Sequence, residues 1–243
     1  MPYYYGYGFD WTYLVLVLPC MILAMWASAN VNSTFQKYSN QHSIRHLTGA
    51  EAAQRVLRHN GVTGVRIERV SGNLTDHYDP RTNVIRLSDS VYNNTSTAAI
   101  GVACHEAGHA VQYAKNYAPI KLRAAIIPLT NIGSRLAMPL IMAGILFGAL
   151  GSFSNTLVYL GIAAFGLSFV FQVITLPVEF NASHRAMDAI ASAGLLTEEE
   201  QRGAKKTLKA AAMTYVAATA TALAQLLRLI VLFGGRGRRR NDG

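Results

Sequence analysis

The chain has 243 residues, of which 51% are hydrophobic and only 14% are charged, and its mean hydropathy is +0.21. This composition is too apolar for an ordinary soluble domain and favours a membrane protein. The formal net charge is +9, but the sequence holds no basic patch interleaved with aromatic residues, so we expect no nucleic-acid partner.

The first apolar segment, residues 11–29, is uncharged and long enough to cross a hydrocarbon core of about 30 Å as a helix. Trp11 and Trp26 lie near its ends, where aromatic rings favour the membrane interface. Residues 27–29 would form a signal-peptide cleavage site, but the preceding residues carry the acidic Asp10 and no basic residue. We therefore predict a retained anchor.

The hydrophilic region that follows, about residues 31–134, holds the material for a water-facing domain. Thr48 is expected to cap a helix at its start. Residues 65–70 alternate as a strand, residues 78–83 indicate a turn, and residues 84–87 indicate a second strand. A small β-ribbon of this kind could hold an extended peptide along its edge, or it could merely cover the next helix.

Residues 102–111 read VACHEAGHAV, a His-Glu-x-x-His pattern in an apolar run that follows candidate N-caps at 94–96. On a helix, His105 and His109 lie on one face, where one metal ion can reach both. Zinc is the usual occupant, since a catalytic zinc takes three protein ligands and leaves one position for water. Glu106 points about 100° away from His105, where it could take a proton from that water. The alternative is a pair of core histidines, but the uncharged flanks favour a zinc cleft.

Two further crossings, residues 136–153 and 157–177, are joined by the short uncharged link 154–156 and predict a transmembrane hairpin. A last apolar stretch, residues 210–233, is weaker because it is rich in Ala and Thr and carries Arg228. It could cross the membrane, pack against the hairpin or lie at the interface.

The third metal ligand must come from outside the motif. A hairpin returns the chain to the membrane face that it left, so Glu179 emerges on the side of the two histidines. A carboxylate at the end of an apolar span is costly unless it is paired, solvated or bound to metal. Glu179 is therefore the leading candidate, although an interfacial Glu179 without a metal role is an alternative. His184, Asp188 and Glu106 compete for the position, and His184 lies off the helical face of Glu179.

Three segments, VACHEAGHAVQ, LPVEFNAS and AAAMTYVAA, together with the hairpin make nearly the whole chain resemble the YugP family of membrane zinc metallopeptidases. More distantly, the layout resembles HtpX-like and CAAX prenyl proteases, in which a His-Glu-x-x-His helix and a later Glu bind zinc. The resemblance implies that His105, His109 and Glu179 are the metal ligands. It also implies that Glu106 is the catalytic base. HtpX-like enzymes place an Asp four residues after the ligand Glu, where this chain has Ser183, which can hydrogen-bond an imidazole but cannot offset its charge.

The expected fold is a mainly α membrane protein with transmembrane helices and a small α+β zinc-metallopeptidase domain that carries the His-Glu-x-x-His helix. The expected function is a membrane-bound, zinc-dependent endopeptidase, in which one catalytic Zn²⁺ activates a water and Glu106 acts as general base. Tyr215 or Asn181 could stabilise the oxyanion, although packing is the simpler interpretation of Tyr215. The alternatives are a catalytically silent metal-binding membrane scaffold and an intramembrane site-2-type protease.

The expected partners are membrane lipid and a protein or peptide substrate, which could be a membrane protein. Basic residues beside the first three crossings favour a multi-pass protein of the cell membrane with its zinc site on the cytoplasmic side. The basic tail, residues 236–240, either touches anionic lipid or is solvated. The expected division is an N-terminal transmembrane anchor (1–30), a water-facing domain with the zinc helix (31–134), a transmembrane hairpin (135–178), a helix with the third zinc ligand (179–209) and a C-terminal apolar helix with the tail (210–243).

Overall fold

The computed structural model describes residues 10–148 and 151–234, and it forms two compact units. The first, here the site unit, contains residues 27–125 and 174–216. The second, here the span unit, contains the described residues up to Trp26, residues 126–173, and those from Ala217 onward. The predicted fold class is confirmed, because the chain is mainly helical with one small sheet.

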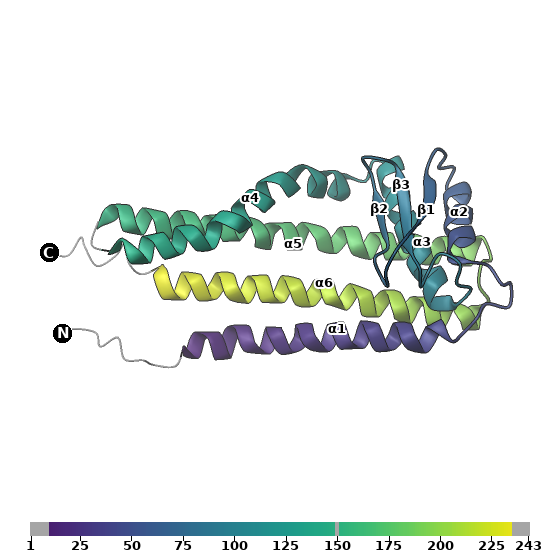
Figure 1. The fold of residues 1–243 in the computed structure, drawn as a ribbon, viewed down its shortest axis with the longest axis horizontal. Helices are drawn as coiled ribbons and strands as arrows, with labels where there is room; N and C mark the ends of the chain where they lie inside the picture. Colours follow the sequence, from purple (N-terminus) through teal and green to yellow (C-terminus); the bar gives the residue numbers. More distant parts are fainter. Residues whose placement is uncertain (1–9, 149–150, 235–243) are drawn as a thin grey trace. The chain divides into compact units, whose positions relative to one another are not determined.

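In chain order the elements are η1, a π-helix (Tyr13–Val17), α1 (Leu18–Ser39), α2 (Gly49–His59), β1 (Arg66–Val70), β2 (His77–Asp79), β3 (Val84–Ser88), α3 (Thr97–Ala114), α4 (Ala118–Leu146), α5 (Ser152–Ser192) and α6 (Glu198–Phe233) (Figure 1).

Four helical segments of the described chain are long and apolar enough to cross a membrane: Tyr13–Ser39, Ala118–Leu146, Ser152–Ser192 and Glu198–Phe233. The last of these contains the weaker apolar stretch and its Arg228. That arginine forms an ion pair with Asp10 and lies over the ring of Tyr13, so its charge is compensated. The helices extend beyond the apolar stretches. The predicted division of the chain into five segments, at residues 30, 134, 178 and 209, stays a prediction. The basic tail lies outside the described residues.

Within the span unit, α4 and α5 pack closely at their glycines. A Cβ at Gly144 would lie 2.8 Å from the carbonyl oxygen of Ser154. The predicted link at residues 154–156 is wrong, because α4 ends at Leu146 and α5 already begins at Ser152. Gly151 precedes α5 in a left-handed conformation (φ 64°) that glycine adopts easily. The hydroxyls of Ser154 and Thr156 donate to backbone carbonyls, so these polar residues are satisfied inside the helix.

The core of the site unit lies between α2, α3 and β3. Thr48 caps α2 as predicted, because its hydroxyl accepts from the Glu51 N–H and the Glu51 carboxylate accepts from the Thr48 N–H. This capping box begins α2 with its apolar face turned to the core. The buried apolar residues of this core include Ala52, Ala53, Val56, Leu57, Ile85, Leu87, Ile100, Ala103 and Ala107.

The sheet has three strands in the order β1-β3-β2. β1 and β3 confirm the two predicted strands at residues 65–70 and 84–87. However, β1 pairs with β3 in parallel and β2 pairs with β3 antiparallel, so the sheet is not the predicted two-stranded ribbon. The additional strand, His77–Asp79, falls partly in the predicted turn and is too short to show alternation. The turn is shorter than the predicted one at residues 78–83, because β2 takes up its first two residues. Within it, Asp79 accepts from the Arg81 N–H and the Thr82 hydroxyl, and Asn83 is left-handed (φ 55°). β2 is consequently an edge strand that contacts α3.

Two glycines on α3 allow that helix to approach its neighbours. A Cβ at Gly101 would lie 3.2 Å from the Cα of Ala204 on α6. A Cβ at Gly108, inside the His-Glu-x-x-His motif, would lie 2.6 Å from the carbonyl oxygen of Ala182 on α5. Because these neighbours are backbone atoms, they cannot turn away as a flexible side chain would. Gly108 therefore sets the close approach of the motif to α5.

Replacing Gly108 by Ala should destabilise the protein by about 1–3 kcal/mol, since the new methyl group must push α3 from the α5 backbone. Gly166→Ala is the matched control on α5, because a Cβ there meets nothing within 4 Å and alanine favours the helix. Thermal unfolding of both purified proteins in the same detergent measures the effect. Equal melting temperatures for the two variants would contradict the close contact at Gly108.

Candidate metal centre

Helix α3 presents both histidines of the motif. Of the three candidate caps, Ser96 begins the helix, and its hydroxyl accepts from the Ala99 N–H at 3.2 Å. His105 and His109 follow one turn apart, with ring centroids separated by 4.7 Å and planes at 82°. The structure thus places the two imidazoles on one helix face, as their spacing predicts.

Glu179 on α5 brings a carboxylate to the two imidazoles. Its Oε2 lies 3.2 Å from Nε2 of His105 and 3.5 Å from Nε2 of His109. Ligand atoms about 2.1 Å from a tetrahedral zinc ion lie about 3.4 Å from one another, which is close to both distances. The side chains of His105, His109 and Glu179 therefore fit a zinc ion in donor type and in spacing, and the chain offers this group as a candidate metal site.

The other candidates for the third position do not belong to the donor group. The His184 side chain is 74% exposed, and its Nδ1 lies 2.7 Å from the Asp188 carboxylate. These two residues form an exposed pair away from the imidazoles. Glu106 lines the cavity beside His105 but does not belong to the group of three donors. Of these candidates, the structure brings only Glu179 to the two histidines.

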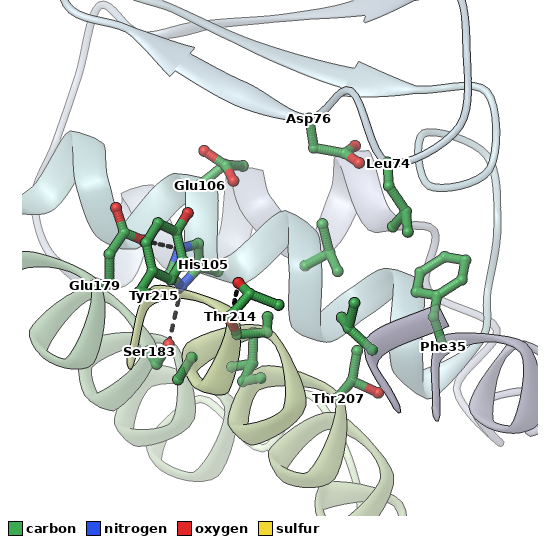
Figure 2. Close-up of a pocket in the computed structure, with 15 residues that line it drawn as sticks. Phe35, Leu74, Asp76, His105, Glu106, Glu179, Ser183, Thr207, Thr214 and Tyr215 are labelled. Atoms are coloured by element: carbon green, nitrogen blue, oxygen red, sulfur yellow. Dashed lines mark hydrogen bonds and ion pairs between the residues drawn. The ribbon is translucent and has the colours of Figure 1, made fainter. Parts of the chain in front are cut away.

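The donor group opens into a cavity of about 230 Å³ within the site unit (Figure 2). Leu74 and Asp76 face it from the strand side, whereas Thr207, Thr214 and Tyr215 face it from α6. The lining residues are Val31, Phe35, Leu74, Asp76, Val102, His105, Glu106, Glu179, Ser183, Thr207, Leu208, Ala211, Ala212, Thr214 and Tyr215. The cavity therefore combines titratable groups with largely apolar walls.

Two comparisons relate the chain to known proteins. A family model described as "putative neutral zinc metallopeptidase" matches residues 13–234. The chain belongs to this family. It is also 45% identical, over 221 residues, to the "putative membrane protease YugP" of Bacillus subtilis (strain 168), which covers 91% of this chain and 96% of that protein. No solved structure matches the chain.

In this member of the zinc metallopeptidase family, Arg123 on α4 compensates the charge of Glu179. Its guanidinium Nη1 lies 3.2 Å from Oε1 of Glu179, while Oε2 faces the histidines. The Glu179 side chain is only 3% exposed, and a carboxylate buried to this degree needs such a partner. Arg123 therefore holds one oxygen of Glu179 and leaves the other for the donor group.

Gln112 orients the imidazole of His109. Its side-chain amide donates to the Val178 carbonyl at 2.8 Å and to Oδ1 of Asn181 at 3.0 Å. The amide orientation is thereby set, so Oε1 of Gln112 accepts from Nδ1–H of His109 at 3.0 Å. This tautomer leaves the lone pair of His109 on Nε2, the atom that faces Glu179 and the one that a metal requires.

Ser183 is the corresponding partner of His105. Its Oγ lies 3.1 Å from Nδ1 of His105, so the imidazole can donate to the hydroxyl and leave Nε2, which lies 3.2 Å from Oε2 of Glu179, available to a metal ion. Burial alone would lower the pKa of His109, but the hydrogen bond to Glu179 and the charge of Glu106 raise it above the ordinary value. A metal ion at this site must therefore compete with a proton.

Three residues near the donor group were not predicted from the sequence: Gln112, Arg123 and Asp76. Gln112 has a local signal, since it follows His109 by three residues and so lies on the same helix face. Arg123 and Asp76 have none, because Arg123 reaches Glu179 from α4 and Asp76 reaches the cavity from the connection between β1 and β2. Burial raises the pKa of the Asp76 carboxyl, although hydrogen bonds from Ser88 oppose this effect. Asn181, which was considered for oxyanion stabilisation, does not line the cavity, and its Oδ1 accepts from Gln112 and Arg185.

Replacing Gln112 by Leu should weaken zinc binding about 10- to 100-fold, since the His109 imidazole loses the partner that fixes its tautomer. Competition with a fluorescent chelator measures the affinity. Gln54→Leu on α2, outside the cavity, is the control and should bind zinc as tightly as the parent. An unchanged affinity in Gln112→Leu would show that His109 is oriented without the amide.

Proposed function

We propose that the protein is a membrane-bound, zinc-dependent endopeptidase that holds one catalytic Zn²⁺ through His105, His109 and Glu179. The observation that carries this proposal is the convergence of His105 Nε2, His109 Nε2 and Glu179 Oε2 beside Glu106 in one cavity. The family match supports zinc and peptide hydrolysis, and the name of the Bacillus subtilis relative supports the membrane.

The proposed mechanism assigns the proton transfers to Glu106. A bound zinc ion would lower the pKa of water and polarise a peptide carbonyl. Glu106 lines the cavity next to His105 and is only 8% exposed. From this position its carboxylate accepts a proton from the attacking water and delivers it to the leaving amine.

Tyr215 is the proposed hydrogen-bond donor to the oxyanion. Its phenol reaches the cavity from α6 and lies beside His105 and Glu179 (Figure 2). A donor placed in advance where negative charge develops lowers the barrier more effectively than one that must reorient.

The substrate backbone is proposed to bind as an extended strand. β2 contacts α3 and forms one edge of the sheet, whose order is β1-β3-β2. An edge strand can pair with a peptide through main-chain hydrogen bonds and so hold its scissile carbonyl in register. A protein or peptide, including a membrane protein, is the substrate class that this geometry accommodates.

The membrane placement is also a proposal. Four apolar helices support a multi-pass protein of the cell membrane in contact with lipid. Lys37, Lys121, Arg123 and Arg135 lie near the apolar segments and favour a cytoplasmic zinc site, because basic residues gather on the cytoplasmic side of membrane proteins.

Replacing Glu106 by Gln should keep zinc and the fold but lower hydrolysis of a casein-type substrate in detergent about 10²- to 10⁴-fold, since an amide cannot accept the proton. Glu199→Gln, on the exposed first turn of α6, is the control and should retain full activity. Equal turnover by Glu106→Gln and the parent would exclude the proposed peptidase. A phenotype in cells that survives this change would favour the metal-binding scaffold.

Replacing Glu179 by Ala should abolish stoichiometric zinc binding and activity, whereas His184→Ala should keep both. Five residues along a helix rotate the side chain by about 500°, which leaves the two residues about 140° apart, so one metal ion cannot use both. Metal analysis of the two purified proteins decides the assignment. Loss of zinc in His184→Ala, with zinc retained in Glu179→Ala, would reverse it.

A further inference from the structure

The cavity contains an acidic side chain that the proposed mechanism does not use. Asp76 lies in the connection between β1 and β2 and faces the cavity from the strand side (Figure 2). Glu106 and Glu179 are the other carboxylates of the lining, and the lining contains no Lys or Arg. One negative charge thus remains after Glu179 is assigned to the metal and Glu106 to proton transfer.

The connection that carries Asp76 is pinned to the end of β3. Ser88 donates to the Asp76 carboxylate twice, through its N–H at 2.7 Å and its hydroxyl at 2.9 Å. Asp89 accepts from the Gly72 N–H at 3.2 Å and donates its own N–H to the Gly72 carbonyl at 3.2 Å. Between these anchors Leu74 adopts a left-handed conformation (φ 54°), which is uncommon for a residue with a side chain. The loop therefore holds Leu74 and Asp76 at the cavity at some cost in backbone strain.

Asp76 has no basic partner among the described residues, unlike two acidic residues that lie close to it in the chain. Asp79 pairs with Arg86, and Asp89 pairs with Arg69. A half-buried carboxylate with only neutral hydrogen-bond donors is stabilised when a cation reaches it, because charge-assisted hydrogen bonds are the stronger ones.

The cavity also has room for the rest of such a ligand. Apolar side chains make up much of its walls and include Phe35, Leu74, Val102 and Leu208. Its volume of about 230 Å³ is smaller than the pockets of about 300–1,000 Å³ that enclose whole small molecules. An apolar stem with a cationic end matches this lining better than a larger neutral group.

We propose that Asp76 is a specificity-determining residue that binds a cationic nitrogen group of the substrate in the cavity next to the scissile bond. Two sources carry this chemistry: the side chain of a Lys or Arg residue, and the free amino group at the N-terminus of a peptide, in which case the peptidase would act as an exopeptidase. In either case the apolar walls contact the hydrocarbon stem or the backbone that leads to the charge. This inference rests on the proposed peptidase function and names its substrate class.

Binding to zinc-loaded Glu106→Gln protein in detergent tests the inference without hydrolysis. The probes are short fluorescent peptides without other charges. In one arm, acetylated peptides carry Lys or norleucine at each position in turn, because norleucine keeps the stem and lacks the ammonium group. In the other arm, the norleucine peptide has either a free or an acetylated N-terminus. Fluorescence anisotropy gives the affinity ratio for each pair.

We expect one arm to favour the cationic peptide about 10- to 100-fold, as a charge-assisted hydrogen bond would, and Asp76→Asn in the same background to bring that ratio near one. Asp76→Glu, which retains the charge, should preserve most of the preference. The control Glu68→Gln, on β1 and paired with Arg66, should leave the ratio unchanged.

A ratio near one in both arms, or a ratio that Asp76→Asn does not alter, overturns the inference. A purely structural role for Asp76 would give the second result, since loss of its hydrogen bonds to Ser88 would weaken cationic and neutral peptides alike. Hydrolysis of the favoured peptide by the parent protein is measured separately. An Asp76-dependent ratio without hydrolysis would refute the peptidase while leaving the cation site supported.

Discussion

The buried carboxylate of Glu179 is the interaction on which the arrangement of the site depends. One of its oxygens faces His105 and His109 on α3, and the other faces Arg123 on α4. A buried charge is costly without such compensation, so the carboxylate draws three helices to one point. The same pairing explains how the chain can place Glu179 near the end of a long apolar segment.

Close packing of α3 against α5 positions the residues around the Glu179 carboxylate. Gly108 removes the side chain that would separate α3 from α5, and Gln112 then crosses the gap to the Val178 carbonyl. The histidines are held by Gln112 and Ser183, whose hydrogen bonds leave both Nε2 atoms towards Glu179. Within largely apolar walls these polar contacts are stronger than they would be in water. The orientation of the two imidazoles thus depends on the packing that places Gln112 and Ser183 beside them.

The cavity separates chemistry from recognition. The donor group and Glu106 serve the proposed hydrolysis, whereas Asp76 on the β1–β2 connection serves the proposed choice of substrate. The connection is attached to β3, and β2 is the edge strand proposed to bind the peptide backbone. One small sheet would therefore supply both the register of the peptide and the charge that selects it. The family relationship supports the proposed hydrolysis, and nothing in it bears on the proposed choice of substrate.

The sequence by itself determined the features that depend on local periodicity. The spacing of His105 and His109 places them on one helix face, uninterrupted apolar runs indicate the long helices, and the return of the chain after the predicted hairpin favours Glu179 as the third donor. The strands at residues 65–70 and 84–87 were predicted, but β2 and the parallel pairing of β1 with β3 were not, because that pairing joins segments that have no shared local pattern. Only the tertiary structure brought Arg123 to Glu179 and Asp76 to the cavity. Their roles come from contacts between elements far apart in the chain, and such contacts depend on how the helices and the sheet pack.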